Sequence, residues 1–209
     1  MPSTLDIRRR IRSVKNTAQI TKAMQMVAAS KMRKSQAAAL AGRPYQEVLN
    51  RALGALRGRI DPQATPLLVD RPVHRELILV ISTDKGLCGA LNTNLFRELT
   101  AIDATEASFS AVGRKALQFL VRTRRNLLAD FQVSEIPRTQ EVRPIADFCV
   151  EKFLSGEVDR VRVVYSKFVN TLMQQATTVN LLPVSQSFLL SSLFPAVLWD
   201  WQDLYHVMI

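Results

Sequence analysis

The sequence predicts an α/β fold, in which a long N-terminal helix with a coiled-coil seam precedes a small Rossmann-like sandwich. Three observations indicate it. Residues 3–41 contain neither proline nor glycine, strong helix formers fill that stretch, and the later residues alternate between strand-like and helix-like segments. We divide the chain into the helix at 1–58, a linker at 59–74, the α/β domain at 75–184 and a divergent tail at 185–209.

The N-terminal helix has a clear start signal. Ser3 or Thr4 can cap the first turn, and Asp6 places an anion where the helix dipole favours one. Pro44 would only kink the helix, because the helical pattern resumes after it. A helix of about 40–55 residues is roughly 60–80 Å long. No domain of this size has a core of that length, so we expect much of the helix to need a partner.

Apolar residues recur along this helix at the 4-3-4 spacing of a coiled-coil seam. A second stripe with the same spacing begins at Ile20 and includes Met24. The predicted seam residues are Ile7, Ile11, Val14, Ala18, Ile20, Val27, Ala28 and Met32. Such a helix needs a second helix beside it. Packing against its own domain is the alternative, which the length disfavours.

The positive charge is concentrated in the same segment. The chain carries a formal net charge of +10, and residues 1–46 hold ten Lys or Arg against a single acid, Asp6. The remainder is nearly neutral, so the helix must face something acidic or polar. A nucleic-acid-binding arm is the alternative interpretation. It is disfavoured because the basic residues and the apolar seam occupy the same segment, whereas basic-zipper DNA-binding proteins keep them in separate segments. The segment also has few aromatic rings that could stack on bases.

The middle of the chain is predicted to be a linker followed by an α/β unit. Residues 54–72 are rich in glycine and proline. A continuous apolar strand at 77–81 leads through the glycine-containing stretch 82–92 into a helix ending near residue 102. Further strands are predicted at 109–112, 127–133, 161–165 and 172–182. Helices are predicted at 113–123 and 142–154, and the last strand is a candidate for antiparallel pairing.

Residues 82–92, with the sequence STDKGLCGALN, lie between a predicted strand and a predicted helix. Phosphate-binding loops occupy the same position in α/β folds. It lacks both glycine patterns of nucleotide-binding loops, and Lys85 precedes the glycines instead of following them. We therefore expect a structural turn with an exposed contact surface, and a nucleotide-dependent enzyme remains the alternative. Cys88 has no nearby histidine to activate it. The sequence predicts no catalytic residue, metal or cofactor.

Composition excludes several other classes. No apolar run reaches the roughly 20 residues of a membrane-spanning helix, and the N-terminus lacks the apolar core of a secretory signal. Cys88 and Cys149 are far apart and have no metal-ligand spacing, which disfavours a disulfide framework or a structural zinc site. His74 and His206 are the two histidines. We expect a reducing compartment and no direct insertion into a membrane.

Several motifs together resemble one family. The segments 6–17, 20–24 and 26–34 resemble the N-terminal helix of the gamma subunit of F-type ATP synthases, and 82–92 is similar to that family's central signature. Tyr165 and the segments 167–171 and 181–183 are similar to its late-domain motifs. The resemblance covers about residues 1–184, and no resemblance is evident in the tail at 185–209.

The resemblance implies a non-catalytic rotor subunit in the central stalk of a proton-translocating ATP synthase. Its N-terminal helix would form half of an antiparallel coiled coil inside the ring of alpha and beta subunits. Its Rossmann-like domain would lie near the epsilon subunit and the membrane c-ring. Proton flow would turn this stalk and drive ATP synthesis or hydrolysis. The implied location is peripheral, on the cytoplasmic face of the bacterial inner membrane, and no nucleic acid is expected as a partner.

The resemblance also implies where the subunits would touch. An acidic loop of the beta subunits makes the cations of the helix candidates for electrostatic contact, with Met24 where helix and head subunits meet. The residues 85–88 would form a second contact loop. The complete set is Arg8, Arg9, Arg10, Met24, Lys31, Arg33, Lys34, Lys85, Gly86, Leu87 and Cys88.

Overall fold

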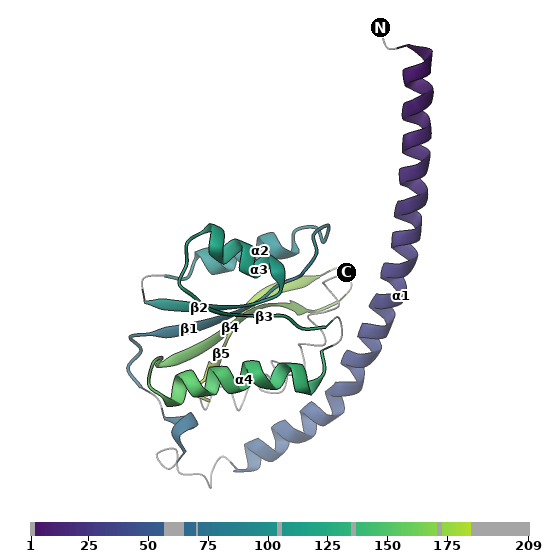
Figure 1. Ribbon diagram of the computed structural model, residues 1–209. Coiled ribbons are helices and arrows are strands. Elements are labelled where there is room, and N and C mark those ends of the chain that lie inside the picture. The colour runs from purple at the N-terminus through teal and green to yellow at the C-terminus, as the bar shows by residue number, and fades with distance from the viewer. Residues whose placement is uncertain are drawn as a thin grey trace.

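The chain folds into a long helix and a separate sheet domain. The computed structural model describes residues 3–56, 65–69, 71–103, 106–134, 137–170 and 173–184. The helix, α1, runs beside the domain and its N-terminal half projects beyond it (Figure 1). The predicted fold class, a long N-terminal helix with a small α/β sandwich, is confirmed.

Helix α1 spans Thr4–Leu56 without a break, with Pro44 inside it. Its first turn is closed by two reciprocal hydrogen bonds. The backbone N–H of Asp6 donates to Ser3 Oγ (3.3 Å), and the carboxylate of Asp6 accepts from the backbone N–H of Ser3 (3.3 Å). Ser3 therefore acts as the cap and Asp6 as its partner three residues later, as in a capping box.

The domain is built on a five-stranded sheet in the order β3-β2-β1-β4-β5. The strands are β1 (Glu76–Ile81), β2 (Ala107–Val112), β3 (Leu127–Phe131), β4 (Arg160–Phe168) and β5 (Gln174–Leu182). Strands β1 to β4 pair in parallel, and β5 pairs antiparallel with β4. Strand β1, which is apolar and buried from Leu77 to Ile81, lies at the centre, as expected for a parallel strand that is covered on both faces.

Helices cover both faces of the sheet (Figure 1). The helices α2 (Leu91–Thr100) and α3 (Arg114–Arg122) lie on one face, and α4 (Thr139–Leu154) lies on the other. Each face has its own apolar core, one around Ile78 and Phe109 and the other around Leu79 and Phe153. This placement follows from right-handed crossovers, since the chain moves outward from β1 to β3 and then returns to β4.

The short 3-10 helix η2 (Pro66–Leu68) was not predicted. Leu67 packs against the α4-side core and its carbonyl accepts from Val184 N–H (2.9 Å). Arg71 lies over the ring of Phe153, with 4.9 Å between its Cζ and the ring centroid. Part of the segment predicted as linker is therefore attached to the domain.

Helix α4 begins at Thr139, three residues before its predicted start. Glu141 explains the difference, because its carboxylate accepts from the backbone N–H of Ser134 (2.7 Å) and of Arg138 (3.3 Å). None of the described helices is long and apolar enough to cross a membrane. The tail at 185–209 lies outside the described residues.

Candidate subunit interface

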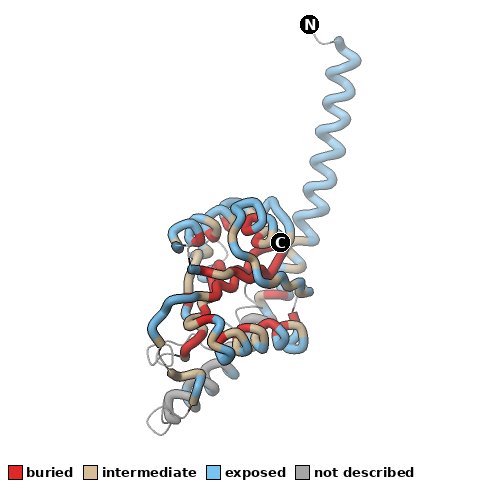
Figure 2. The backbone as a smooth tube through the Cα atoms, turned by 60° about the vertical axis from the view of Figure 1, so that its left-hand side comes forward, coloured by how far each residue is buried: buried red, intermediate tan, exposed pale blue. Residues whose placement is uncertain are grey.

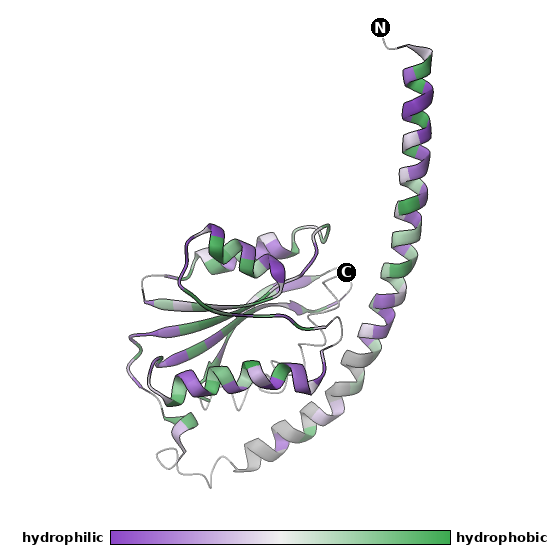
Figure 3. Cartoon of the chain, viewed as in Figure 1, coloured by the Kyte–Doolittle hydropathy of each residue, from purple (hydrophilic) through white to green (hydrophobic). Residues whose placement is uncertain are grey.

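The N-terminal half of helix α1 is exposed to solvent (Figure 2), and hydrophobic and hydrophilic residues are interspersed along it (Figure 3). Every described residue from Ser3 to Val27 is exposed, including Val14 at 67% and Met24 at 54% of their full surface. Of the predicted seam, Ala28 is half-buried and the other members are exposed. Exposed apolar rows of this length are typical of surfaces that a partner covers.

The two apolar stripes lie on different sides of the helix. Ile11 and Ile20 are nine residues apart, which at about 100° per residue places them on opposite sides. Met32 returns to within about 60° of Ile11, whereas Ala28 lies between the two sides. The seam therefore does not form one continuous strip, and α1 offers two apolar surfaces that a single second helix could not cover together.

The cations of α1 are also in solvent. Arg8, Arg9, Arg10, Arg33 and Lys34 are exposed, whereas Lys31 is half-buried. Asp6, the single acid of the first 46 residues, is engaged by Ser3. The surface of the helix is therefore strongly electropositive, as the sequence predicted.

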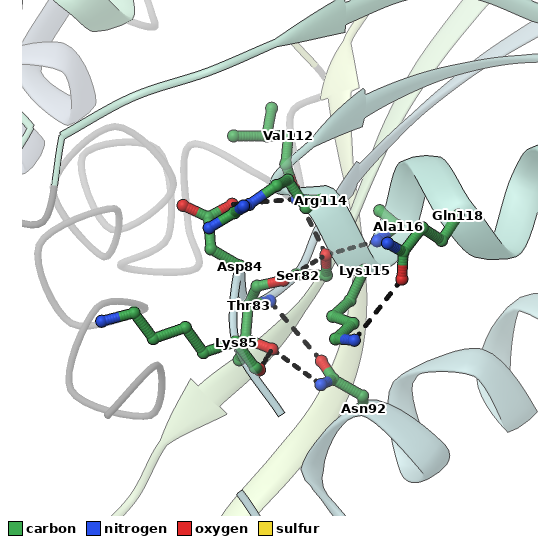
Figure 4. A network of polar contacts seen from close by, with 10 residues as sticks. All are labelled: Ser82, Thr83, Asp84, Lys85, Asn92, Val112, Arg114, Lys115, Ala116 and Gln118. Carbon is green, nitrogen blue, oxygen red and sulfur yellow. Dashed lines mark hydrogen bonds and ion pairs between the residues drawn. The ribbon is translucent and has the colours of Figure 1, made fainter. Parts of the chain in front are cut away.

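The loop after β1 is fixed from inside by hydrogen bonds (Figure 4). Ser82 is buried, and its Oγ accepts from the backbone N–H of Ala116 at 2.6 Å. Gly113 follows β2 with a φ of 89°, and a Cβ there would lie 2.3 Å from the carbonyl oxygen of Ser82. The ends of β1 and β2 are thus held so closely that only glycine fits at position 113.

The polar side chains of this loop are directed to one another. Asn92 Nδ2 donates to Thr83 Oγ1 (2.7 Å), and that hydroxyl donates to the carbonyl oxygen of Lys85 (2.7 Å). Asp84 accepts from the backbone N–H of Arg114 (2.9 Å). These bonds tie the loop to the helices α2 and α3, so the structure shows a braced turn at this position.

The tip of the braced turn is exposed to solvent. Lys85, Gly86 and Leu87 are exposed, and Leu87 is 95% exposed with a φ of 64°. A bulky residue in the left-handed region is uncommon, and such strain gathers at functional sites. A large aliphatic side chain held in solvent by a rigid loop is a feature suited to a contact with another protein.

Both cysteines are at least partly shielded from solvent. Cys88 is half-buried, and its Sγ accepts from Asn92 Nδ2 at 3.2 Å. Burial raises the pKa of Cys149 to about 12, so this thiol stays protonated. The described residues contain no group of three His, Cys, Asp or Glu side chains that could hold a metal.

The structure places the predicted contact residues in two separate sets. One set lies along α1 and the other on the loop after β1. Sequence reasoning missed the residues that shape the loop, namely Ser82, Asp84, Asn92 and Gly113. A glycine directly after a short apolar strand was the available signal for Gly113, since such glycines often mark a close backbone approach.

Comparisons with known proteins complete the description. A family model described as ATP synthase matches residues 3–198. The ATP synthase gamma chain of Opitutus terrae is 52% identical over 184 residues, which make up 88% of this chain and 62% of that protein. The gamma chain of Roseiflexus castenholzii is 46% identical in an alignment of 193 positions, which covers 88% of this chain and 67% of that one.

This chain belongs to the ATP synthase gamma-chain family. The resemblance seen in the motifs is thereby confirmed, and a non-catalytic subunit is the role this family has. The family model matches as far as residue 198, which is 14 residues beyond the segment that carried the resemblance. The chain spans less than two-thirds of the length of the Opitutus terrae relative.

Solved structures share the fold of this gamma-family chain. A chain of the central stalk and c-ring of the Tetrahymena thermophila mitochondrial ATP synthase is 21% identical, with a TM-score of 0.60. That match covers 90% of this chain and 91% of the other. A chain of the Euglena gracilis mitochondrial ATP synthase rotor is 23% identical, with a TM-score of 0.61, over 83% of this chain and 60% of the other.

Proposed function

We propose that this chain is the central-stalk rotor subunit of a proton-translocating F-type ATP synthase. In that role α1 turns within the ring of alpha and beta subunits and couples proton flow to ATP synthesis or hydrolysis. The observation that carries the proposal is the surface of α1, which is basic and carries two exposed apolar stripes outside the sheet domain. Membership of the gamma-chain family supports it.

The two stripes suit two different partners. The stripe of Ile7, Ile11 and Val14 has the spacing of a seam for a second helix, so it is the coiled-coil side. The stripe of Ile20, Met24 and Val27 lies on the other side and would face the head subunits. The exposed arginines and lysines of α1 then meet acidic groups of the beta subunits, where polar contacts allow sliding better than a continuous apolar seal.

The sheet domain is the lower part of the rotor in this proposal. The epsilon subunit and the membrane c-ring would be its neighbours, and the braced loop with Lys85 and Leu87 would contact the head. Relatives are bacterial gamma chains, so we place the complex at the cytoplasmic face of the inner membrane, with this chain bound peripherally. No nucleic acid takes part.

Co-expression with the alpha and beta subunits of Opitutus terrae tests the proposal. The tagged chain is expected to copurify with both subunits and to raise ATP hydrolysis above that of alpha and beta alone. Substituting Arg8, Arg9 and Arg10 together by glutamine should weaken copurification, whereas Arg122→Gln on the exposed surface of α3 should not. A chain that never associates with the head subunits, but shifts DNA in a salt-dependent gel assay, would instead support the nucleic-acid alternative.

A further inference from the structure

The antiparallel pair β4 and β5 extends past the edge at which the other strands end. Val80 of β1 is paired with Val164 of β4, and β1 ends one residue later. Strand β4 continues to Phe168, so it runs three residues further than the register position opposite Ile81. At about 3.3 Å per residue this extension measures roughly 10 Å. The tip of the β4–β5 ribbon therefore projects beside the loop that follows β1.

Backbone hydrogen bonds give the tip a defined shape. The N–H groups of Val169 and Asn170 both donate to the carbonyl oxygen of Met173 (3.2 and 3.1 Å). The N–H of Met173 donates to the side-chain oxygen of Asn170 at 2.8 Å. Farther along the ribbon, Thr178 Oγ1 donates to Glu98 of α2 at 3.4 Å. The middle of the ribbon thus contacts the same helix that the braced loop leads into.

Exposed apolar side chains occur on both projections. Val169 is 47% and Met173 is 57% exposed at the ribbon tip, and Leu87 stands at the tip of the loop. Because β1 and β4 are neighbouring strands, both projections fall within one standard interface, whose area of about 800 Å² per partner is roughly 30 Å across. A protein that contacts Leu87 therefore comes within reach of Val169 and Met173.

The charge of this edge indicates the chemistry of the partner. The described residues at the ends of β1, β2 and β4 include the cations Lys85, Arg114, Lys115 and Lys167. Asp84 is the one carboxylate among them, and Arg114 engages it. The side-chain ammonium groups of Lys85 and Lys167 make no hydrogen bond or ion pair with another described residue. Each of these two lysines precedes an exposed aliphatic residue by two positions, so acidic groups around an apolar contact would complement both.

We infer that Lys167, Val169 and Met173 near the ribbon tip form one composite docking surface with the loop Lys85–Leu87, which binds an acidic segment of a head subunit. The inference rests on the proposed function for the identity of the partner complex. It adds that the β4–β5 ribbon, and not the loop alone, contacts the head. Lys167 would bind a carboxylate, while Val169 and Met173 cover an apolar side chain between acidic residues.

Photocrosslinking in the complex with the Opitutus terrae alpha and beta subunits is the direct test. A benzophenone amino acid is placed at position 87, 169 or 173, and at the exposed position 121 of α3 as a control. Positions 87, 169 and 173 are expected to crosslink to the same head subunit, and position 121 to none. Crosslinking from 87 without any from 169 or 173 would overturn the inference and leave the proposed function standing. Failure of the chain to copurify would overturn both.

Substitution supplies a second, quantitative readout. The double variant Val169→Ser/Met173→Ser should bind the head subunits about tenfold or more weakly, roughly the loss expected for one buried apolar side chain. Val121→Ser should leave binding unchanged. Lys167→Gln should reduce the salt dependence of binding, and Arg122→Gln should not. Unaltered binding of the double variant, with a normal unfolding transition, would contradict the inference.

Discussion

Gly113 determines how closely the ends of β1 and β2 approach. A Cβ at this position would lie 2.3 Å from the Ser82 carbonyl oxygen, and the φ of 89° is itself unfavourable for any other residue. We expect Gly113→Ala to lower the free energy of unfolding by roughly 3 kcal/mol. Urea unfolding of the purified chain measures this.

Gly86 provides the matched control for that substitution. A Cβ at Gly86 would meet only Lys115 Cε at 4.0 Å, and its φ is not in the left-handed region. Gly86→Ala should therefore change the free energy of unfolding by less than about 0.5 kcal/mol. If both substitutions changed the free energy of unfolding equally, the close approach of Gly113 to the Ser82 carbonyl oxygen would not be the reason that glycine is required at position 113.

Glu141 connects stability to pH at the start of α4. Hydrogen bonds from the backbone N–H and hydroxyl of Ser134 hold the pKa of Glu141 below its usual range. The charged form is thus favoured in the folded state. This contribution is present above the unfolded pKa of about 4.3 and is lost as pH falls through the lower folded pKa.

The expected result is a pH-dependent difference between two proteins. Glu141→Gln should be less stable than the parent chain at pH 7, and the difference should shrink as pH falls below about 4. Urea midpoints at several pH values give the measurement. Glu151→Gln, at an exposed position of the same helix, is the control. A gap that stays constant down to pH 3 would contradict this assignment.

At the scale of elements, α1 carries the prediction most closely tied to coupling. Met24 belongs to the stripe opposite the Ile11 side, so in the proposed rotor it faces the head subunits and not the second helix. Met24→Lys adds an ammonium that would seek carboxylates there and strengthen contacts in some rotary positions. We expect proton pumping to fall more than ATP hydrolysis in the assembled enzyme.

Met26→Lys is the comparison for that experiment. Met26 is also exposed, but two residues along the helix it points about 160° away from Met24. It should leave the ratio of pumping to hydrolysis near that of the parent. If both substitutions reduced pumping and hydrolysis in proportion, the distinction between the two sides of α1 would be wrong.

The elements themselves were largely predictable because their signals are local. The uninterrupted run of helix formers predicted α1, and the apolar run at 77–81 predicted β1. Boundaries were less predictable where they depend on distant partners. Strand β1 starts at Glu76, whose carboxylate binds Arg160 and Arg162 on β4, and no local pattern reveals that ion pair. The contact residues on α1 and the loop remain predictions, since they concern surfaces of other subunits.

For the whole molecule, the boundary of the domain can be tested by dissection. Leu67 packs on the α4-side core, and Arg71 Nη1 donates to the carbonyl oxygen of Phe153 at 3.3 Å. A fragment of residues 65–184 should therefore be more stable than one of residues 75–184, by about 1–3 kcal/mol from one partly buried leucine and one hydrogen bond. Thermal and urea unfolding of both fragments decide it. Equal stabilities would return residues 65–74 to the role of a linker.

The charge of α1 has a consequence for the chain before it assembles. Two exposed apolar stripes would make a bare helix adhere to its own copies, but the ten cations of residues 1–46 repel those copies over a Debye length of about 10 Å at 0.1 M salt. Added salt should therefore promote self-association, which sedimentation velocity would detect as growing oligomers, while it weakens binding to an acidic partner. In the proposed rotor, the arginines and lysines would therefore have a second role, which is to keep newly made copies of the chain apart until an acidic partner binds the helix.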